Sequence, residues 1–157
     1  MLPVQRIISG GQTGADRAAL DFAIQHGYQH GGWAPSGRGA EDGPIPLKYQ
    51  LTELADGGYR QRTKRNVAES NGTLIVNVGA LDGGSLATQF FALRLGRACF
   101  LAQLDAGTMD NTAMRLTQWL QVHDVRTLNV AGPRESKRPG IYDLTYKLLE
   151  MASTRQS

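Results

Sequence analysis

The residues with the clearest potential to bind a ligand lie in two glycine-rich turns. Each turn lies between an apolar run and a helical pattern. The first turn is Gly10–Gly14, which follows Ile7 and Ile8 and precedes an apolar helical stripe that begins at Ala15. Glycines let the backbone turn sharply and approach a ligand, and the first N–H groups of a helix have no partner within that helix. The turn therefore predicts a site for phosphate or a similar anion.

The identity of that anion stays open at this point. The turn lacks the Lys-Ser/Thr ending of a P-loop, and it also lacks the complete dinucleotide fingerprint with three spaced glycines. An alternative without a ligand is that Thr13 and Asp16 only cap the helix that starts at Ala15.

A second turn of the same kind occurs at 79–85. It follows the apolar run Thr73–Val78 and precedes an expected helix from Leu86 to Gly96. Because ligands of parallel sheets bind beyond the carboxyl ends of the strands, the two turns are expected to face one ligand from adjacent strands. A plain helix cap by Ser85 is the alternative.

A long loop rich in Gly and Pro, Pro35–Pro46, is a candidate lid over that ligand. Loops of this length inside a compact domain are usually functional or disordered. Arg38, Glu41 and Asp42 supply one cation for an anion and two carboxylates for ring nitrogens or hydroxyls. A merely solvated loop is the alternative.

Two further segments carry cations. The basic run Arg60–Arg65 is by default a solvated helix face, with a phosphate contact through Arg62 or Asn66 as the less favoured interpretation. After the last strand, Arg134 is positioned for a bidentate contact to phosphate or carboxylate, unless it forms only a surface pair with Glu135.

Other chemistries find little support. The three histidines, His26, His30 and His123, do not have the spacing of a metal site, and Cys99 lies in an apolar run typical of a buried structural thiol. No Ser-His-Asp triad is recognisable from spacing, because triads are defined by geometry.

Strand and helix patterns alternate along the chain, which predicts a parallel sheet covered on both faces and hence a three-layer α/β sandwich. The expected strands are 5–9, 32–34, 73–78, 98–103 and 127–131. The expected helices are 15–26, about 60–70, 86–96, 111–122 and 142–152.

Length and charge limit the remaining choices. The 157 residues are expected to form one domain, 1–157, and the net charge of +3 suits an anionic ligand without indicating nucleic acid. No apolar run is long enough for a signal peptide or a membrane span, so a cytoplasmic protein is expected. The helix expected at 86–96 is apolar nearly all round, which indicates a central position or a subunit contact.

Five motifs cover nearly the whole chain and are specific in combination. They are SGGQTGAD at 9–16, GWxP at 32–35 with GRxAEDGxIP at 37–46, RTxxNV at 62–67, GGSxxT at 83–88, and AGPRES with PGIY at 131–142. Together they resemble the family of molybdenum-cofactor carrier proteins, within a wider Rossmann-like group that includes lysine-decarboxylase-like nucleotide phosphoribohydrolases.

The resemblance implies a Rossmann-like, non-catalytic protein that binds and protects the molybdenum cofactor (molybdopterin), a pyranopterin with a terminal phosphate, and delivers it to a molybdoenzyme. It also implies a homo-oligomer, a dimer or tetramer. The residues expected to bind the cofactor are Gly10, Gly11, Gln12, Thr13, Gly14, Arg17, Arg38, Glu41, Gly83, Gly84, Ser85, Thr88 and Arg134.

An enzyme remains an alternative. The phosphoribohydrolases carry PGGxGTxxE with a catalytic glutamate, and Phe90 stands at that glutamate's place here. Without a carboxylate a hydrolase loses its acid–base contribution, about a hundredfold or more, unless Glu41 or Glu53 supplies one. A nucleotide sensor shares all the binding residues and differs only in its ligand, which is a nucleotide or an inorganic oxyanion in place of the pterin.

Overall fold

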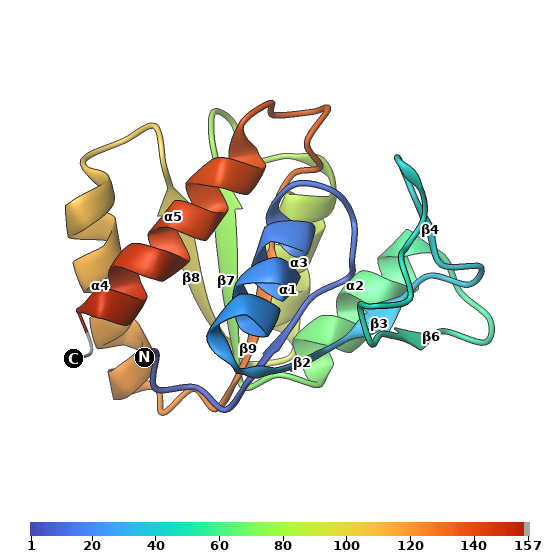
Figure 1. Ribbon diagram of the computed structural model, residues 1–157, viewed down its shortest axis with the longest axis horizontal. Coiled ribbons are helices and arrows are strands. Elements are labelled where there is room, and N and C mark those ends of the chain that lie inside the picture. Colours follow the sequence, from blue (N-terminus) through green and yellow to red (C-terminus); the bar gives the residue numbers. More distant parts are fainter. Residues whose placement is uncertain (156–157) are drawn as a thin grey trace.

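The computed structural model describes residues 1–155 as a Rossmann-like α/β sandwich around a parallel sheet (Figure 1). The sheet has the strand order β2-β1-β9-β7-β8, and every neighbouring pair is parallel. Its strands are β1 (Arg6–Ile8), β2 (Gln29–Gly31), β7 (Gly72–Asn77), β8 (Ala98–Gln103) and β9 (Thr127–Ala131). Every residue of β7 is buried, as expected for a central strand covered on both faces, and the predicted fold class is confirmed.

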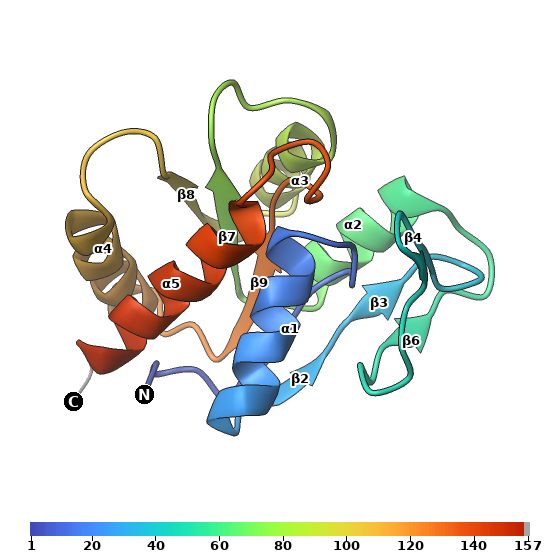
Figure 2. The same ribbon diagram turned by 45° about the horizontal axis from the view of Figure 1, so that its top comes forward.

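Helices cover both faces of this sheet. They are α1 (Ala15–His26), α2 (Tyr59–Ala68), α3 (Gly83–Arg94), α4 (Met109–Val122) and α5 (Ile141–Thr154). Figures 1 and 2 show α1, α4 and α5 on one face, with α2 and α3 on the other. Right-handed crossovers explain this arrangement. The connection through α1 runs from β1 toward the β2 edge of the sheet, whereas the connection through α3 runs from β7 toward the opposite, β8 edge, so the two helices lie on opposite faces. Both helices begin beyond the carboxyl ends of their strands, where ligands of such sheets bind.

The main core lies between the sheet and α1, α4 and α5. Phe22 of α1 and Leu148 of α5 are fully buried against strand residues such as Leu74 and Leu128. Each such side chain contributes about 1.5–3 kcal/mol on burial. The core therefore fixes the start of α1 and the end of β9 relative to each other.

The segment between β2 and α2 forms two small sheets beside the main one (Figure 2). In one, β3 (Trp33–Ala34) pairs in parallel with β6 (Thr52–Glu53). In the other, β4 (Gly39–Ala40) and β5 (Gly43–Pro44) form a hairpin, so the predicted lid loop contains regular structure. A second apolar cluster of Leu20, Ala34, Ile45 and Tyr49 joins this region to α1.

The single strand predicted at 32–34 is confirmed only for Trp33–Ala34, and the chain forms two strands here instead of one. Residues 29–31 pair with β1, whereas Trp33 and Ala34 belong to a different sheet. Gly32 separates them with φ of +126°, and a Cβ there would lie 2.1 Å from the carbonyl oxygen of Ser9. Only glycine allows the chain to leave the sheet at this close approach.

The helix expected from Leu86 begins three residues earlier, at Gly83, because Asp82 takes the extended N-cap position. The alternative of a helix cap by Ser85 is therefore excluded, because Ser85 lies inside the first turn. Two glycines in the first turn concealed this start, since glycine disfavours helix interiors but is tolerated at their ends. Within residues 1–155, no helix has both the length and the apolar character needed to cross a membrane.

Candidate functional site

A cavity of about 450 Å³ opens at the carboxyl ends of β1, β9 and β7. This volume is in the range of small-molecule sites. Both glycine turns contribute to it, although β9 lies between their strands, so the turns do not come from adjacent strands as expected. The predicted site residues that line the cavity are Gly10, Gln12, Glu41, Gly84, Ser85, Thr88 and Arg134.

The turn at Gly10–Gly14 directs most of its backbone donors into the protein. Four N–H groups are involved: Gly11 to Ser9 Oγ (3.4 Å), Gln12 to Asp16 Oδ2 (3.3 Å), Thr13 to Gln12 Oε1 (3.0 Å) and Ala15 to the Pro133 carbonyl (3.3 Å). A donor that already has a protein acceptor gains little from a ligand. This turn is therefore mainly a scaffold.

Gly11 and Gly14 allow other parts of the protein to pack closely against this turn. Gly14 has φ of +79°, and a Cβ there would lie 2.5 Å from the Pro133 carbonyl oxygen. A Cβ at Gly11 would meet the side chains of Leu51 and Ile45, not the cavity. We expected a ligand to approach the backbone at Gly11, but the side chains of the second apolar cluster lie against this residue instead.

Arg17 and Arg38 also stabilise loops and do not line the cavity. Arg17 is nearly buried, donates from Nε and Nη2 to the Gly11 carbonyl and forms a bidentate ion pair with Asp42. Arg38 donates to four loop carbonyls, those of Ile45, Pro46, Tyr49 and Leu51. Its guanidinium satisfies backbone acceptors that the irregular loop leaves unpaired, so it does not flank the cavity as expected.

The turn at the start of α3 differs, because its backbone donors are left free. The N-cap Asp82 makes no side-chain cap, since its carboxylate pairs with Lys137 Nζ at 2.6 Å. The hydrogen bond from Lys137 is the main cause that holds the pKa of Asp82 below its usual value, and the positive charge of the ammonium lowers it further. A Cβ added at Gly84 would meet nothing within 4 Å. The first N–H groups of α3 therefore adjoin open cavity space.

Two hydroxyls extend this open turn. Ser85 and Thr88 are buried on α3 and line the cavity. Thr88 donates to the Gly84 carbonyl at 2.9 Å, whereas the Ser85 hydroxyl has no hydrogen-bond partner among residues 1–155. The Ser85 hydroxyl is not enclosed and has no partner in the described part of the chain, so it is available to a ligand at this end of the cavity.

Sequence reasoning gave too little weight to an ion pair inside the cavity. Arg62 Nη1 lies 3.0 Å from Asp16 Oδ2, and the two side chains are 12% and 7% exposed. Burial raises the pKa of Asp16, and Arg62 opposes that rise. A Cβ at Gly10 would lie 1.5 Å from Arg62 Nη1, so this glycine makes room for the guanidinium. The basic run suggested Arg62 only as a minor alternative, and Asp16 looked like a helix cap.

The remaining cavity wall comes mainly from α2 and from the turn after β9. Asn66 bonds both the N–H (2.8 Å) and the carbonyl (3.1 Å) of Trp33, which attaches β3 to α2. The other lining residues, which were not among the expected binding residues, are Ala40, Tyr59, Thr63, Asn129, Val130, Ala131, Gly132, Pro133 and Lys137. No spacing rule links positions so far apart along the chain.

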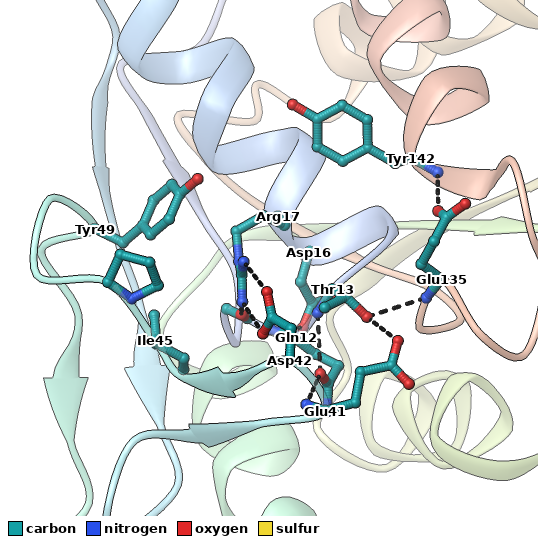
Figure 3. A network of polar contacts seen from close by, with 12 residues as sticks. Gln12, Thr13, Asp16, Arg17, Glu41, Asp42, Ile45, Tyr49, Glu135 and Tyr142 are labelled. Atoms are coloured by element: carbon teal, nitrogen blue, oxygen red, sulfur yellow. Dashed lines mark hydrogen bonds and ion pairs between the residues drawn. The ribbon is translucent and has the colours of Figure 1, made fainter.

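Glu41, at the tip of the β4–β5 hairpin, joins three loops at the cavity rim (Figure 3). Its carboxylate accepts from the Ser136 N–H at 3.1 Å and from the hydroxyls of Ser136 and Thr13. Arg134 Nε lies 3.5 Å away. Hydrogen bonds from Ser136 and Thr13 lower the pKa of Glu41. The predicted lid therefore reaches the cavity through one carboxylate.

The surface pair considered for Arg134 and Glu135 is absent from the described residues. Glu135 accepts instead from the N–H groups of Gly140 (2.6 Å) and Tyr142 (3.0 Å), and so caps α5. Figure 3 shows Glu135 between Thr13 and Tyr142. Arg134 is left facing Glu41 and the cavity, with 52% of its side chain exposed.

Two other expectations concern residues away from the cavity. Burial raises the pKa of the Cys99 thiol to about 11, which leaves it protonated at neutral pH and a poor nucleophile. Residues 1–155 contain no group of three or more His, Cys, Asp or Glu side chains arranged to hold a metal ion.

Known proteins that are similar to this chain include a solved structure from Syntrophus aciditrophicus, described as a "putative molybdenum carrier protein". It is 48% identical to this chain, with a TM-score of 0.94, over 96% of this chain and 95% of its own. An (E)-4-hydroxy-3-methyl-but-2-enyl diphosphate reductase is 10% identical with a TM-score of 0.41, over 94% of this chain and 59% of its own. No curated protein matches the chain. The model of the circularly permutated YpsA SLOG family matches residues 7–153, and the chain belongs to that family.

Proposed function

We propose that this protein binds, protects and delivers the molybdenum cofactor, and that it does so without changing the cofactor chemically. The open N-terminus of α3 beside the cavity carries this proposal, together with the 48% identity to the molybdenum carrier protein. The cargo is a pterin with a terminal phosphate, and a molybdoenzyme would receive it.

The phosphate is proposed to lie against the N–H groups of Gly83, Gly84 and Ser85. A helix terminus contributes about 0.3–2 kcal/mol toward an anion, which alone is too little to retain a labile cofactor. Lys137 and Arg134 line the same cavity and add charge-assisted hydrogen bonds. Both already pair with a carboxylate, at 2.6 Å and 3.5 Å, so binding exchanges one acceptor for another.

The cavity also suits a flat, polar ring system. Its volume of about 450 Å³ is ample for a fused heterocycle with a phosphate. Tyr59 offers a half-exposed aromatic ring at its edge, and Asn129 and Asp16 offer hydrogen-bonding groups from the strand ends. These groups favour a heterocyclic phosphate over a bare oxyanion.

Native mass spectrometry of anaerobically purified protein tests the proposal. The protein is expressed in cells that make the cofactor and, as the matched control, in cells whose cofactor synthesis is blocked. A pterin adduct in the first sample alone is expected. An adenine nucleotide in both samples would contradict the carrier and favour a nucleotide sensor.

A phosphoribohydrolase-like enzyme is the second candidate, because Asp16 places a carboxyl group of raised pKa in the cavity. The substitutes considered earlier fit this role less well. Glu41 is engaged by Ser136 and Thr13, and Glu53 accepts from the Gly37 N–H outside the cavity. Phe90 is on the exposed side of α3.

We expect no release of base from AMP, GMP or CMP, as measured by chromatography. The Arg62 guanidinium pairs with the Asp16 carboxylate at 3.0 Å and opposes protonation of that carboxylate. Asp16 is therefore a poor general acid. Turnover that disappears in Asp16→Asn or Glu41→Gln while the fold is retained would establish the enzyme instead.

A second copy of this chain is the proposed partner of α3. Leu86, Phe90 and Leu93 follow one another at helical spacing and are 48%, 46% and 80% exposed. Such an apolar stripe is typical of a subunit contact, in a dimer or tetramer. Light scattering should show an oligomer, and Leu93→Glu should convert it to monomer. A monomeric wild type would refute this contact.

A further inference from the structure

The β4–β5 hairpin is fastened by two neighbouring carboxylates in very different surroundings. Asp42 forms its ion pair with Arg17, whose side chain is only 11% exposed and also bonds the Gly11 carbonyl. Glu41 instead bonds groups on the cavity rim, and it lines the cavity itself. One attachment is therefore part of the scaffold, and the other lies where a ligand can reach it.

The groups around Glu41 form a complete set of oxyanion donors. The Ser136 N–H and hydroxyl, the Thr13 hydroxyl and the Arg134 guanidinium all face the two carboxylate oxygens. The Thr13 hydroxyl accepts from the Glu135 N–H at 3.2 Å, so its own proton is left for Glu41. These donors come from two loops that the core holds together, and they do not depend on the hairpin.

We propose that this set of donors is a second oxyanion subsite, that the Glu41 carboxylate occupies it as an internal substitute, and that an oxyanion group of the ligand releases the hairpin by taking its place. The inference rests on the proposed function only in that the ligand enters this cavity. A carboxylate and a phosphate or sulfate oxygen pair accept the same hydrogen bonds, so the exchange needs no new donors. Asp42 keeps the hairpin attached during the exchange.

Inorganic sulfate is a suitable probe, titrated at constant ionic strength and followed at the backbone amide of Ser136 by NMR. Removal of the competing carboxylate in Glu41→Ala should tighten sulfate binding at this amide by about tenfold. This is the change in affinity that corresponds to one charge-assisted hydrogen bond. Asp42→Asn removes the same charge one residue away and should bind like wild type. Thermal unfolding verifies that each variant is folded.

A third variant separates competition at the subsite from general electrostatics. In Glu41→Ala with Thr13→Ala and Ser136→Ala, the gain should disappear because both hydroxyl donors are lost, and only the Ser136 N–H and the Arg134 guanidinium remain. Hydrogen exchange at 39–44 should increase when sulfate is added to wild type, and this increase should be absent in Glu41→Ala, where the attachment through the Glu41 carboxylate is already lost.

The outcomes are distinct. Unchanged or weaker sulfate binding in Glu41→Ala means that Glu41 is a structural latch or a direct ligand contact, and it overturns the inference while the cavity remains an anion site. Equal tightening in Asp42→Asn also overturns it. Sulfate binding at neither Ser136 nor Gly84 in any variant contradicts both this inference and the proposed phosphate site.

Discussion

The two glycine-rich turns look alike in sequence and differ in what their backbone donors do. In the turn after β1, the N–H groups of Gln12 and Thr13 already bond side-chain oxygens of the same segment. In the turn after β7, Asp82 is held by Lys137, and α3 begins without a cap. Glycine permits close approach of either a ligand or another part of the protein. What distinguishes the two cases is whether the donors are already paired.

The start of α5 provides a third case. Glu135 caps this helix with both carboxylate oxygens, so its donors are paired as well. Of the three helices that start at the strand ends around the cavity, α3 is the one whose first three N–H groups have no acceptor among residues 1–155, whereas α1 and α5 each have a first-turn N–H that is bonded. We therefore propose that a ligand phosphate binds at α3 rather than in the space midway between the two turns.

The largest expected effect concerns the scaffold turn. Gly14→Ala should lower the free energy of unfolding by about 3 kcal/mol, because alanine is strained at φ of +79° and its Cβ would overlap the Pro133 carbonyl. Chemical denaturation measures this loss. Gly84→Ala is the control and should unfold like wild type or slightly later. Equal stability of the two variants would remove the distinction between the turns.

The second prediction concerns the open turn. Gly84→Leu should weaken sulfate binding by about tenfold or more, since the side chain enters space that is empty within 4 Å of the Cβ. Its unfolding free energy should stay close to that of wild type. Calorimetric titration together with denaturation separates the two quantities. Intact binding in this variant would move the anion away from α3.

A smaller effect is expected at Arg134. Arg134→Lys should reduce affinity for molybdopterin by several-fold, up to about tenfold, even though it keeps the charge, because an ammonium does not reproduce a planar bidentate contact. Anaerobic equilibrium dialysis measures it, and binding should also weaken as salt rises. Equal affinities of wild type, Arg134→Lys and Arg134→Ala would exclude Arg134 from the site.

The smallest effect concerns acid stability at the rim. Hydrogen bonds in the folded protein lower the pKa of Glu41 from 4.5, so its contribution is present above that value and is lost as pH falls through the lower folded pKa. Glu41→Gln should therefore unfold more easily at pH 7 and show a shallower loss below about pH 4.5. Parallel acid titrations of thermal unfolding test this. Superimposable profiles would mean that Glu41 contributes no net stability.

Much of the fold was predictable because buried parallel strands and amphipathic helices follow simple periodicities. The helix Ala15–His26 and the strands Ala98–Gln103 and Thr127–Ala131 are confirmed with the predicted bounds. The split at Gly32 was not predictable, since it depends on a contact with Ser9 across the sheet edge.

The candidate site was predictable at its turns and much less so at its side chains. Sequence alone does not show that the Arg38 guanidinium finds four loop carbonyls, or that Gly10 makes room for Arg62. These contacts join distant positions in the chain: Arg62 and its partner Asp16, for example, are 46 residues apart. Pairing of this kind is decided by tertiary packing, which also decides which glycine turn keeps its donors free.

The difference between the two glycine-rich turns is tested most directly by an amide-resolved NMR titration of the wild-type protein with inorganic sulfate. We predict that the amides of Gly83, Gly84 and Ser85 shift with one common dissociation constant, while those of Gln12 and Thr13 move little because they are already bonded. Large shifts at Gln12 and Thr13, with none at Gly84, would contradict it.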